Sequence, residues 1–191
     1  MTHALLLRTP VALPESTTPL TVLAIDPGIT HCGYAVLRAP ETLELSGTWI
    51  PKAKLRGLER HLWLLSKVQD LIAEWQPGVL AYEDFTWRSD DRYLQGRAAF
   101  ERIIGGIQAL ALMPPFPVLM ELLPSRWGQQ LVGSRSHTKP DVARVVNLRL
   151  GTSFKGDIYD NHACDAVGLG LVAMDNTRLM QAALRHTGGR G

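Results

Sequence analysis

Acidic residues end two short apolar segments of this sequence, a placement that suits chemistry but makes a carboxylate costly to bury. Asp26 ends the run Thr21–Ile25 and is followed by a Pro-Gly turn. Glu83 ends a second run, Val79–Tyr82. An ionised carboxylate at the end of a buried strand is unfavourable unless a cation lies near it. We therefore look for a cation that both residues share.

A third acidic cluster, Asp160–Asp165, lies near the C-terminus. His162 and Asp165 are three residues apart, so they share one face of a helix. Carboxylates with an imidazole suit a hard divalent cation such as Mg²⁺. Two such ions about 4 Å apart would contact the attacking and leaving oxygens of a phosphodiester. Each acid also has an ordinary alternative role, because Asp160 or Asn161 can cap a helix and a strand-terminal acid can close a turn.

The elements that must position these acids are predicted from hydrophobic periodicity. Strands are expected at 21–26, 33–39 and 43–50, as an antiparallel meander, and then at 79–83 and 118–122. Helices are expected at 55–75, 91–112, 124–131, 138–150 and 161–174. Strands that first form a meander and then alternate with helices predict an α/β fold with a mixed sheet flanked by helices. The acids would then meet at one edge of that sheet.

Composition sets broad limits. The chain has 191 residues and a formal net charge of +2, which fits one globular domain and permits nucleic-acid binding without requiring it. We expect a flexible extension at 1–20, a folded domain at 21–175 and a C-terminal tail at 176–191. Two cysteines without metal-ligand spacing predict a reducing cytoplasm. No apolar segment is long enough to predict a membrane span.

Five motifs in order resemble the RuvC family of Holliday-junction resolvases. The resemblance covers about residues 21–175. The motifs are Ile25-Asp26-Pro27-Gly28 with Gly33-Tyr34, Glu83 before an aromatic loop, Glu121-x-x-Pro124, Val132-Gly133 with Lys139, and His162-x-x-Asp165-Ala166.

The resemblance implies an RNase H-like fold and a homodimer that grips a four-way DNA junction and makes paired nicks. Asp26, Glu83, His162 and Asp165 match the four metal-binding catalytic positions of the family, which imply Mg²⁺ or Mn²⁺, with two ions per site. Lys139 matches a lysine near the scissile phosphate, where a cation offsets developing charge. A branch-migration complex is a further partner that the resemblance implies.

The sequence departs from the family pattern at two places. Where the family has a second lysine, this chain has Gly128, so Arg126 is the candidate substitute. Where the family places an aromatic wedge, this chain has Thr86, flanked by Phe85 and Trp87. Either aromatic would hold a junction open by insertion between bases, or simply pack against the sheet.

Basic residues cluster beside these motifs and would supply phosphate contacts of little sequence preference. Each cluster alone is equally typical of a solvated face. The predicted DNA-binding residues are Phe85, Trp87, Arg88, Arg92, Arg126, Arg135 and Lys139; Arg144 and Arg149 extend the last cluster.

Three other functions compete. Asp26 to Thr30 also fits the Asp-x-Gly-x-Thr phosphate loop of actin-like ATPases and sugar kinases, but the chain is too short for their second domain. A related nuclease acting on other branched DNA or on ribosomal RNA precursors keeps the same fold. A junction-binding module without catalysis would not need the four acid and imidazole positions.

Overall fold

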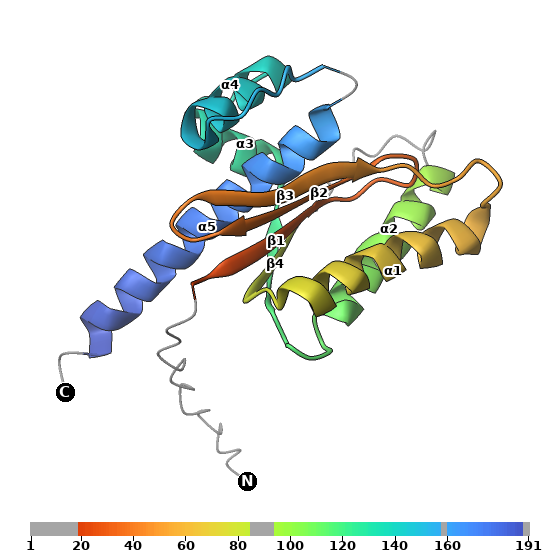
Figure 1. The fold of residues 1–191 in the computed structure, drawn as a ribbon, viewed down its shortest axis with the longest axis horizontal. Helices are drawn as coiled ribbons and strands as arrows, with labels where there is room; N and C mark the ends of the chain where they lie inside the picture. The colour runs from red at the N-terminus through yellow and green to blue at the C-terminus, as the bar shows by residue number, and fades with distance from the viewer. Residues whose placement is uncertain (1–18, 85–93, 158–159, 189–191) are drawn as a thin grey trace, which may run out of the picture.

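The computed structural model describes residues 19–84, 94–157 and 160–188, and the side chains of 94–96 and 183–188 are not described. Five strands and five helices follow one another along the described chain (Figure 1). The strands are β1 (Thr21–Asp26), β2 (Cys32–Arg38), β3 (Thr42–Trp49), β4 (Val79–Glu83) and β5 (Val118–Leu122). The helices are α1 (Gly57–Trp75), α2 (Leu94–Leu110), α3 (Pro124–Val132), α4 (Lys139–Leu150) and α5 (Asn161–Gly188).

The five strands form one mixed sheet in the order β3-β2-β1-β4-β5. The three strands of the meander, β1 to β3, pair antiparallel, with Ala24 of β1 opposite Ala35 of β2. Strand β4 pairs parallel to the other side of β1, with Ala81 opposite Ala24. The last strand, β5, continues the parallel half. This arrangement confirms the predicted mixed sheet. It also brings the C-terminal ends of β1 and β4 to the same edge.

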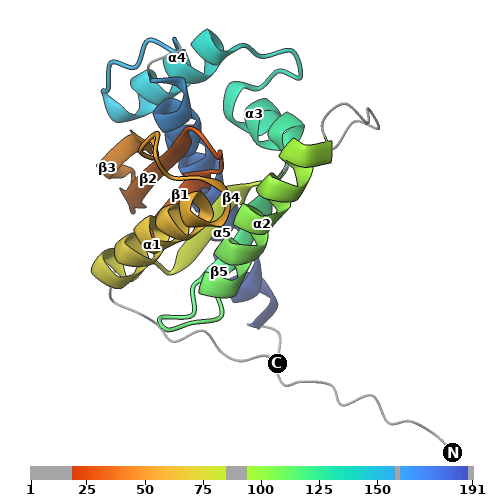
Figure 2. The ribbon, with the colours of Figure 1, turned by 90° about the vertical axis from the view of Figure 1, so that its right-hand side faces the viewer.

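Alternate residues of β1 face two separate apolar clusters, as strand geometry requires. Val22 and Ala24 pack toward α3, α4 and α5, whereas Leu23 and Ile25 pack toward α1 and α2. All four side chains are fully buried. Figures 1 and 2 show the two helix layers on opposite faces of the sheet. Both layers press on β1, so the strand that delivers Asp26 is fixed from both sides.

The last helix, α5, differs most from the sequence-based expectation. Its predicted end near Met174 is wrong, because the helix continues to Gly188 and extends past the sheet (Figure 1). Leu179 and Met180 in this extension are exposed, so burial does not explain the added turns. A tail at 176–191 separate from the domain stays a prediction, and residues 1–18 lie outside the described chain. None of the described helices is both long and apolar enough to cross a membrane.

Candidate active site

The five predicted catalytic residues come together at the C-terminal ends of β1 and β4. Asp26 ends β1, and Glu83 ends the neighbouring parallel strand β4. His162 and Asp165 belong to the first turns of α5, which packs across β1 and β2. Lys139 is the first residue of α4. Thus the sheet and the helix layer that contains α4 and α5 each deliver part of one polar cluster.

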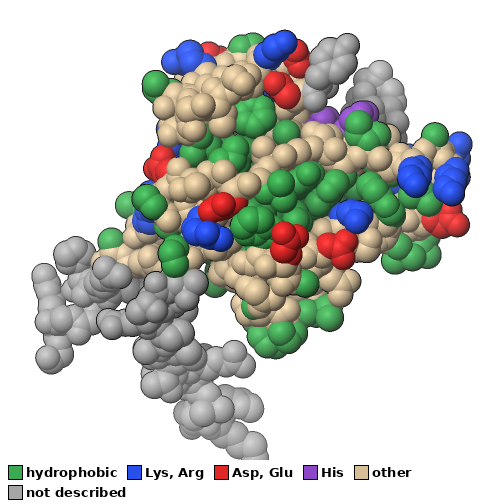
Figure 3. Space-filling view, in the orientation of Figure 1, with side chains coloured by type: hydrophobic (Ala, Val, Ile, Leu, Met, Phe, Trp, Pro, Cys, Tyr) green, Lys and Arg blue, Asp and Glu red, His purple; other side chains and the backbone are tan. Residues whose placement is uncertain are grey.

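The Asp26 carboxylate is bound by the His162 imidazole. Nδ1 of His162 lies 2.7 Å from Oδ2 of Asp26, and the carboxylate can only accept, so this nitrogen carries the proton. The hydrogen bond to Asp26 raises the pKa of His162 against the opposing effect of burial. Nε2, on the opposite side of the ring, is left to act as a ligand or proton carrier. Figure 3 shows histidine side chains at the surface between the sheet and the helices above it.

The Asp165 carboxylate is paired with Lys139. Its side chain is only 3% exposed, whereas Lys139 is 53% exposed and reaches in from solvent. Oδ2 of Asp165 accepts a hydrogen bond from Nζ of Lys139. Burial nevertheless raises the pKa of Asp165, although Lys139 opposes the change. Oδ1 of Asp165 is buried and has no hydrogen-bond partner among the described residues.

Glu83 is the most perturbed carboxyl group of the cluster. Burial raises its pKa to about 8, and the negative charges of Asp26 and Asp165 add to this effect. Lys139 acts in the opposite direction but does not compensate. When all three carboxyl groups are ionised, the site holds more negative charge than Lys139 and His162 balance. Such a surplus at the edge of a sheet is typical of a functional site.

The donor set fits a divalent cation, although the described side chains are not already gathered around one. No group of three or more His, Cys, Asp and Glu side chains in the described ranges is arranged to hold a metal ion. Asp26 and Asp165 instead face His162 and Lys139. Three carboxylates, one with an unpartnered buried oxygen, offer the hard ligands that Mg²⁺ and Mn²⁺ prefer. An incoming ion would compete with Lys139 for Asp165.

Gly33 makes the close approach of α5 to the sheet possible. It lies opposite Asp26 in the β1–β2 pairing. A Cβ at this position would overlap the backbone carbonyl oxygen of His162 and would lie 3.1 Å from Cβ of Asp26. Any larger residue must therefore move the first turn of α5 away from β1. This close contact explains why a glycine occupies position 33 of the Gly33-Tyr34 motif.

His31 lies beside the site, although the sequence did not lead us to predict it as a site residue. Its ring stacks on that of His162, with centroids 5.6 Å apart and planes 10° from parallel. Its Nδ1 lies 3.2 Å from the Thr30 hydroxyl. The available signal was its position in the turn between the first two strands. Asp160, considered as a cap, instead accepts backbone N–H bonds from residues 155–157 and shapes the segment before α5.

The His137 side chain lies beside Gly128, where the family has a second lysine. A Cβ there would overlap the imidazole ring of His137, which also contacts the Trp127 ring. No lysine fits at position 128 unless His137 moves. Arg126 and Arg135 lie exposed. Four of the predicted DNA-binding residues, Phe85, Trp87, Arg88 and Arg92, lie outside the described residues.

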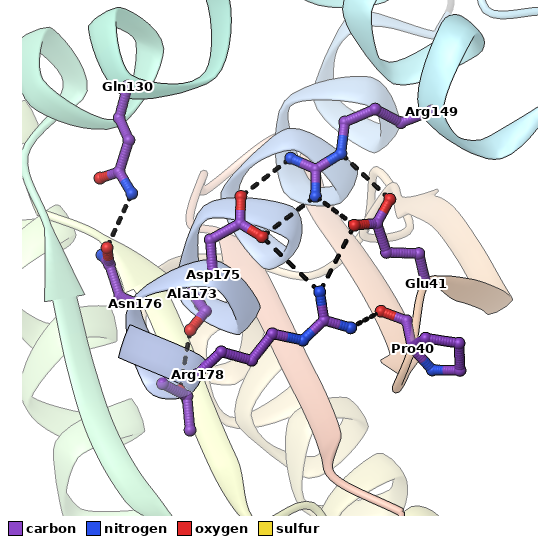
Figure 4. A network of polar contacts seen from close by, with 9 residues as sticks. Pro40, Glu41, Gln130, Arg149, Ala173, Asp175, Asn176 and Arg178 are labelled. Atoms are coloured by element: carbon purple, nitrogen blue, oxygen red, sulfur yellow. Dashed lines mark hydrogen bonds and ion pairs between the residues drawn. The ribbon is translucent and has the colours of Figure 1, made fainter. Parts of the chain in front are cut away.

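Arg149 does not extend the predicted basic surface. Its guanidinium binds the Glu41 carboxylate at 2.6 Å and the Asp175 carboxylate at 2.9 Å, and Arg178 approaches the same two acids (Figure 4). Arg178 also donates to the carbonyl oxygen of Pro40. We call these four charged residues the clamp. It ties the β2–β3 turn to α4 and α5, and its cations are used within the fold.

A family profile described as crossover junction endodeoxyribonuclease RuvC matches residues 22–173, most of the chain. The chain belongs to the RuvC family. Among RuvC relatives, the protein of Campylobacter lari is 27% identical over 162 residues, which are 84% of this chain and 99% of the relative. The protein of Brachyspira hyodysenteriae is 24% identical, covering 84% and 97% of the two chains. Membership makes the chain a nuclease and decides against the ATPase alternative for its Asp-Pro-Gly motif.

Solved structures support the same fold. Thermus thermophilus RuvC in complex with a Holliday junction substrate superimposes with a TM-score of 0.72 at 21% identity, covering 84% of this chain and 96% of that one. The yeast mitochondrial Holliday junction resolvase gives a TM-score of 0.60 at 18% identity, covering 90% and 83%. These neighbours are RNase H-like resolvases, so the expected fold is confirmed. As in the rest of the RuvC family, the activity depends on divalent metal.

Proposed function

We propose that this chain resolves four-way DNA junctions as a homodimer, each protomer hydrolysing one phosphodiester bond at the site of Asp26, Glu83, His162 and Asp165. The observation that supports this proposal most directly is the meeting of three carboxylates and an imidazole at one sheet edge, with Lys139 beside them. Family membership supports junction DNA as the substrate. Two protomers would place one active site at each of the two cuts that resolution requires.

The three carboxylates and Nε2 of His162 would hold Mg²⁺ or Mn²⁺, with two ions per site. Bound ions of this kind activate water and stabilise the attacking and leaving oxygens of the phosphodiester. Asp26 orients His162 through the 2.7 Å bond to Nδ1, which directs Nε2 away from the carboxylate. The burial of Asp165 and Glu83 excludes water from one side of the site and strengthens electrostatic contacts there.

Lys139 would contact the DNA phosphate rather than stabilise the fold. Its ammonium is half-exposed and begins α4, so it can turn from Asp165 toward DNA that lies over the site. Lys139→Ala is expected to slow cleavage by about 100-fold while weakening junction binding only a few-fold. Equal losses in both would make Lys139 an ordinary phosphate contact.

The decisive experiment is cleavage of a synthetic substrate panel with Mg²⁺ or Mn²⁺. A four-way junction, a flap, a linear duplex and a structured RNA are compared, with Asp26→Asn as the inactive control. Paired symmetrical nicks in the junction alone support the proposal. Preferential cutting of flaps or RNA would favour the related-nuclease alternative, and binding without any cutting would favour a junction-binding module. A branch-migration partner and a cytoplasmic location stay predictions.

A further inference from the structure

An open groove of about 670 Å³ lies along one face of α4, beside the site. Pro140, Arg144, Asn147 and Leu148 line it from the helix, at the three- and four-residue steps that share a helix face. Phe154 and Lys155, from the segment after the helix, line its other side. The groove begins at Pro140, the residue that directly follows Lys139 in α4.

The groove is built into the fold. Oδ1 of Asn147 accepts bonds of 2.8 Å from the Phe154 N–H and from the Thr152 hydroxyl, and its Nδ2 donates to the Phe154 carbonyl at 2.7 Å. The Asp160 carboxylate accepts the backbone N–H groups of residues 155–157 at 2.7, 2.9 and 3.2 Å. The segment that carries Phe154 and Lys155 is thus fastened to α4 at one end and to the start of α5 at the other.

The charges in the groove are of one sign. Among the described residues that line it, Arg144 and Lys155 carry charge and none carries a carboxylate. The Arg144 side chain is 68% exposed, with its guanidinium 3.8 Å from Asp141, a weak surface contact. Leu148 is 82% exposed. Cations beside apolar surface suit a phosphate chain with its sugars.

We propose that this groove binds the sugar-phosphate backbone of the DNA strand that leads away from the cut. Arg144 and Lys155 contact phosphates, and Leu148 packs against sugars. Lys139 and Arg144 are five positions apart on α4, about 8 Å along the helix axis, which corresponds to the rise of roughly two base pairs of duplex. This inference rests on the proposed function and extends it, because it places a contact site beyond the catalytic residues.

Salt dependence of binding tests the inference. Arg144→Gln and Lys155→Gln are made in the Asp26→Asn background, with Lys67→Gln on α1 as a control of equal charge change. Each groove variant is expected to bind a synthetic four-way junction about 5-fold more weakly and to lower the slope of log Kd against log salt by about 1. The slope of Lys67→Gln stays that of the parent. Groove variants that match Lys67→Gln overturn the inference.

A cross-linking experiment locates the strand. A photoreactive group is attached to Leu148→Cys, and to Leu62→Cys on α1 as the control, since both native cysteines are buried. Leu148→Cys is expected to capture the junction strand within a few nucleotides of the cut, and Leu62→Cys is not. Failure of Leu148→Cys to capture DNA overturns the inference. If polyglutamate but not DNA blocks labelling of the cysteine in Leu148→Cys, the groove binds an acidic protein segment instead of DNA.

Parallel assays of the unmodified protein separate the two proposals. If it cuts junctions while the groove variants behave like their controls, the groove inference fails and the proposed function stands. If it neither binds nor cuts junctions, the proposed function fails, and the groove inference fails with it.

Discussion

Helices α4 and α5 are joined twice by a cation and a carboxylate, and the two bridges lie ten residues apart on each helix. Lys139 binds Asp165 where both helices begin, and Arg149 binds Asp175 further along both. The helices must therefore run in the same direction. The first bridge lies in the catalytic cluster, whereas the second belongs to the clamp.

The two bridges differ in charge balance. In the clamp, two arginines meet two carboxylates, and the hydrogen bond from Arg149 lowers the pKa of Glu41. In the catalytic cluster, one lysine and one histidine face three carboxylates, and burial raises the pKa values of Glu83 and Asp165. The same helix pair thus supports a charge-balanced structural contact at one end and a cluster with more acidic than basic groups at the other.

The largest effect is expected for Asp26→Asn. It should lower junction cleavage by at least about 1,000-fold, roughly 4 kcal/mol in activation free energy, because a carboxylate that we propose as a metal ligand is lost. Junction affinity, which depends on other cations, should change little. Asp175→Asn in the clamp is the matched control and should reduce thermal stability while cleavage by the folded protein persists. Comparable loss of cleavage in both variants would contradict the division between the two clusters.

The pH dependence of stability should have opposite signs at the two clusters. The folded-state pKa of Glu83 is about 8 against an ordinary 4.5, so folding binds a proton between these values and stability falls as pH rises through them. The loss should reach about 5 kcal/mol in protein freed of metal by a chelator. His162 and Asp165 act in the same direction, because their pKa values are also raised. Urea unfolding at a series of pH values measures this.

The variant Glu83→Gln separates the contribution of Glu83 from the others. Glu83→Gln should remove much of the stability loss above pH 4.5. The Glu41 pKa is lowered, so the clamp's contribution is present above an ordinary 4.5 and is lost as the medium becomes more acidic. An unchanged pH profile in Glu83→Gln would show that its carboxyl group is not perturbed as the fold implies.

Gly33→Ala should separate close packing in the site from close packing in the core. We expect cleavage to fall by about 100-fold, because the added methyl group displaces His162 from Asp26 by a fraction of an ångström or more. Gly170→Ala is the control, because its added Cβ would crowd Leu37 and lie 3.2 Å from Cβ of Ala24. Both should lose about 1–3 kcal/mol of stability, but only Gly33→Ala should lower kcat strongly. Similar kcat values in the two variants would remove the positioning role of Gly33.

The smallest effect concerns two arginines of α4. Arg149→Ala should lower the free energy of unfolding by about 2 kcal/mol, since Glu41 and Asp175 keep only Arg178 as a partner. Arg144→Ala should change it by less than about 0.5 kcal/mol, because that side chain is exposed. Chemical unfolding of the two variants makes the comparison. Equal stability losses would mean that the clamp adds nothing beyond helix propensity.

Much of the fold was predictable because local patterns reflect it directly. The runs before Asp26 and Glu83 are buried on both faces of a sheet, so they appear in the sequence as short continuous apolar segments. The extension of α5 was not predictable in this way. Its apolar pattern fades after Met174, and the helix continues where Asp175 and Arg178 bind partners far away in sequence.

Residue types and spacing by themselves determined the mixed sheet, the three acids at element ends and the family. Tertiary structure decided which charged side chains are already paired with opposite charges within the fold. Arg144 and Arg149 look equivalent in sequence, yet one faces solvent and the other is enclosed by two carboxylates. It likewise decided that Asp26 binds His162, and that Gly33 allows this contact. The physical reason is that pairing depends on distances between elements, which local sequence does not encode.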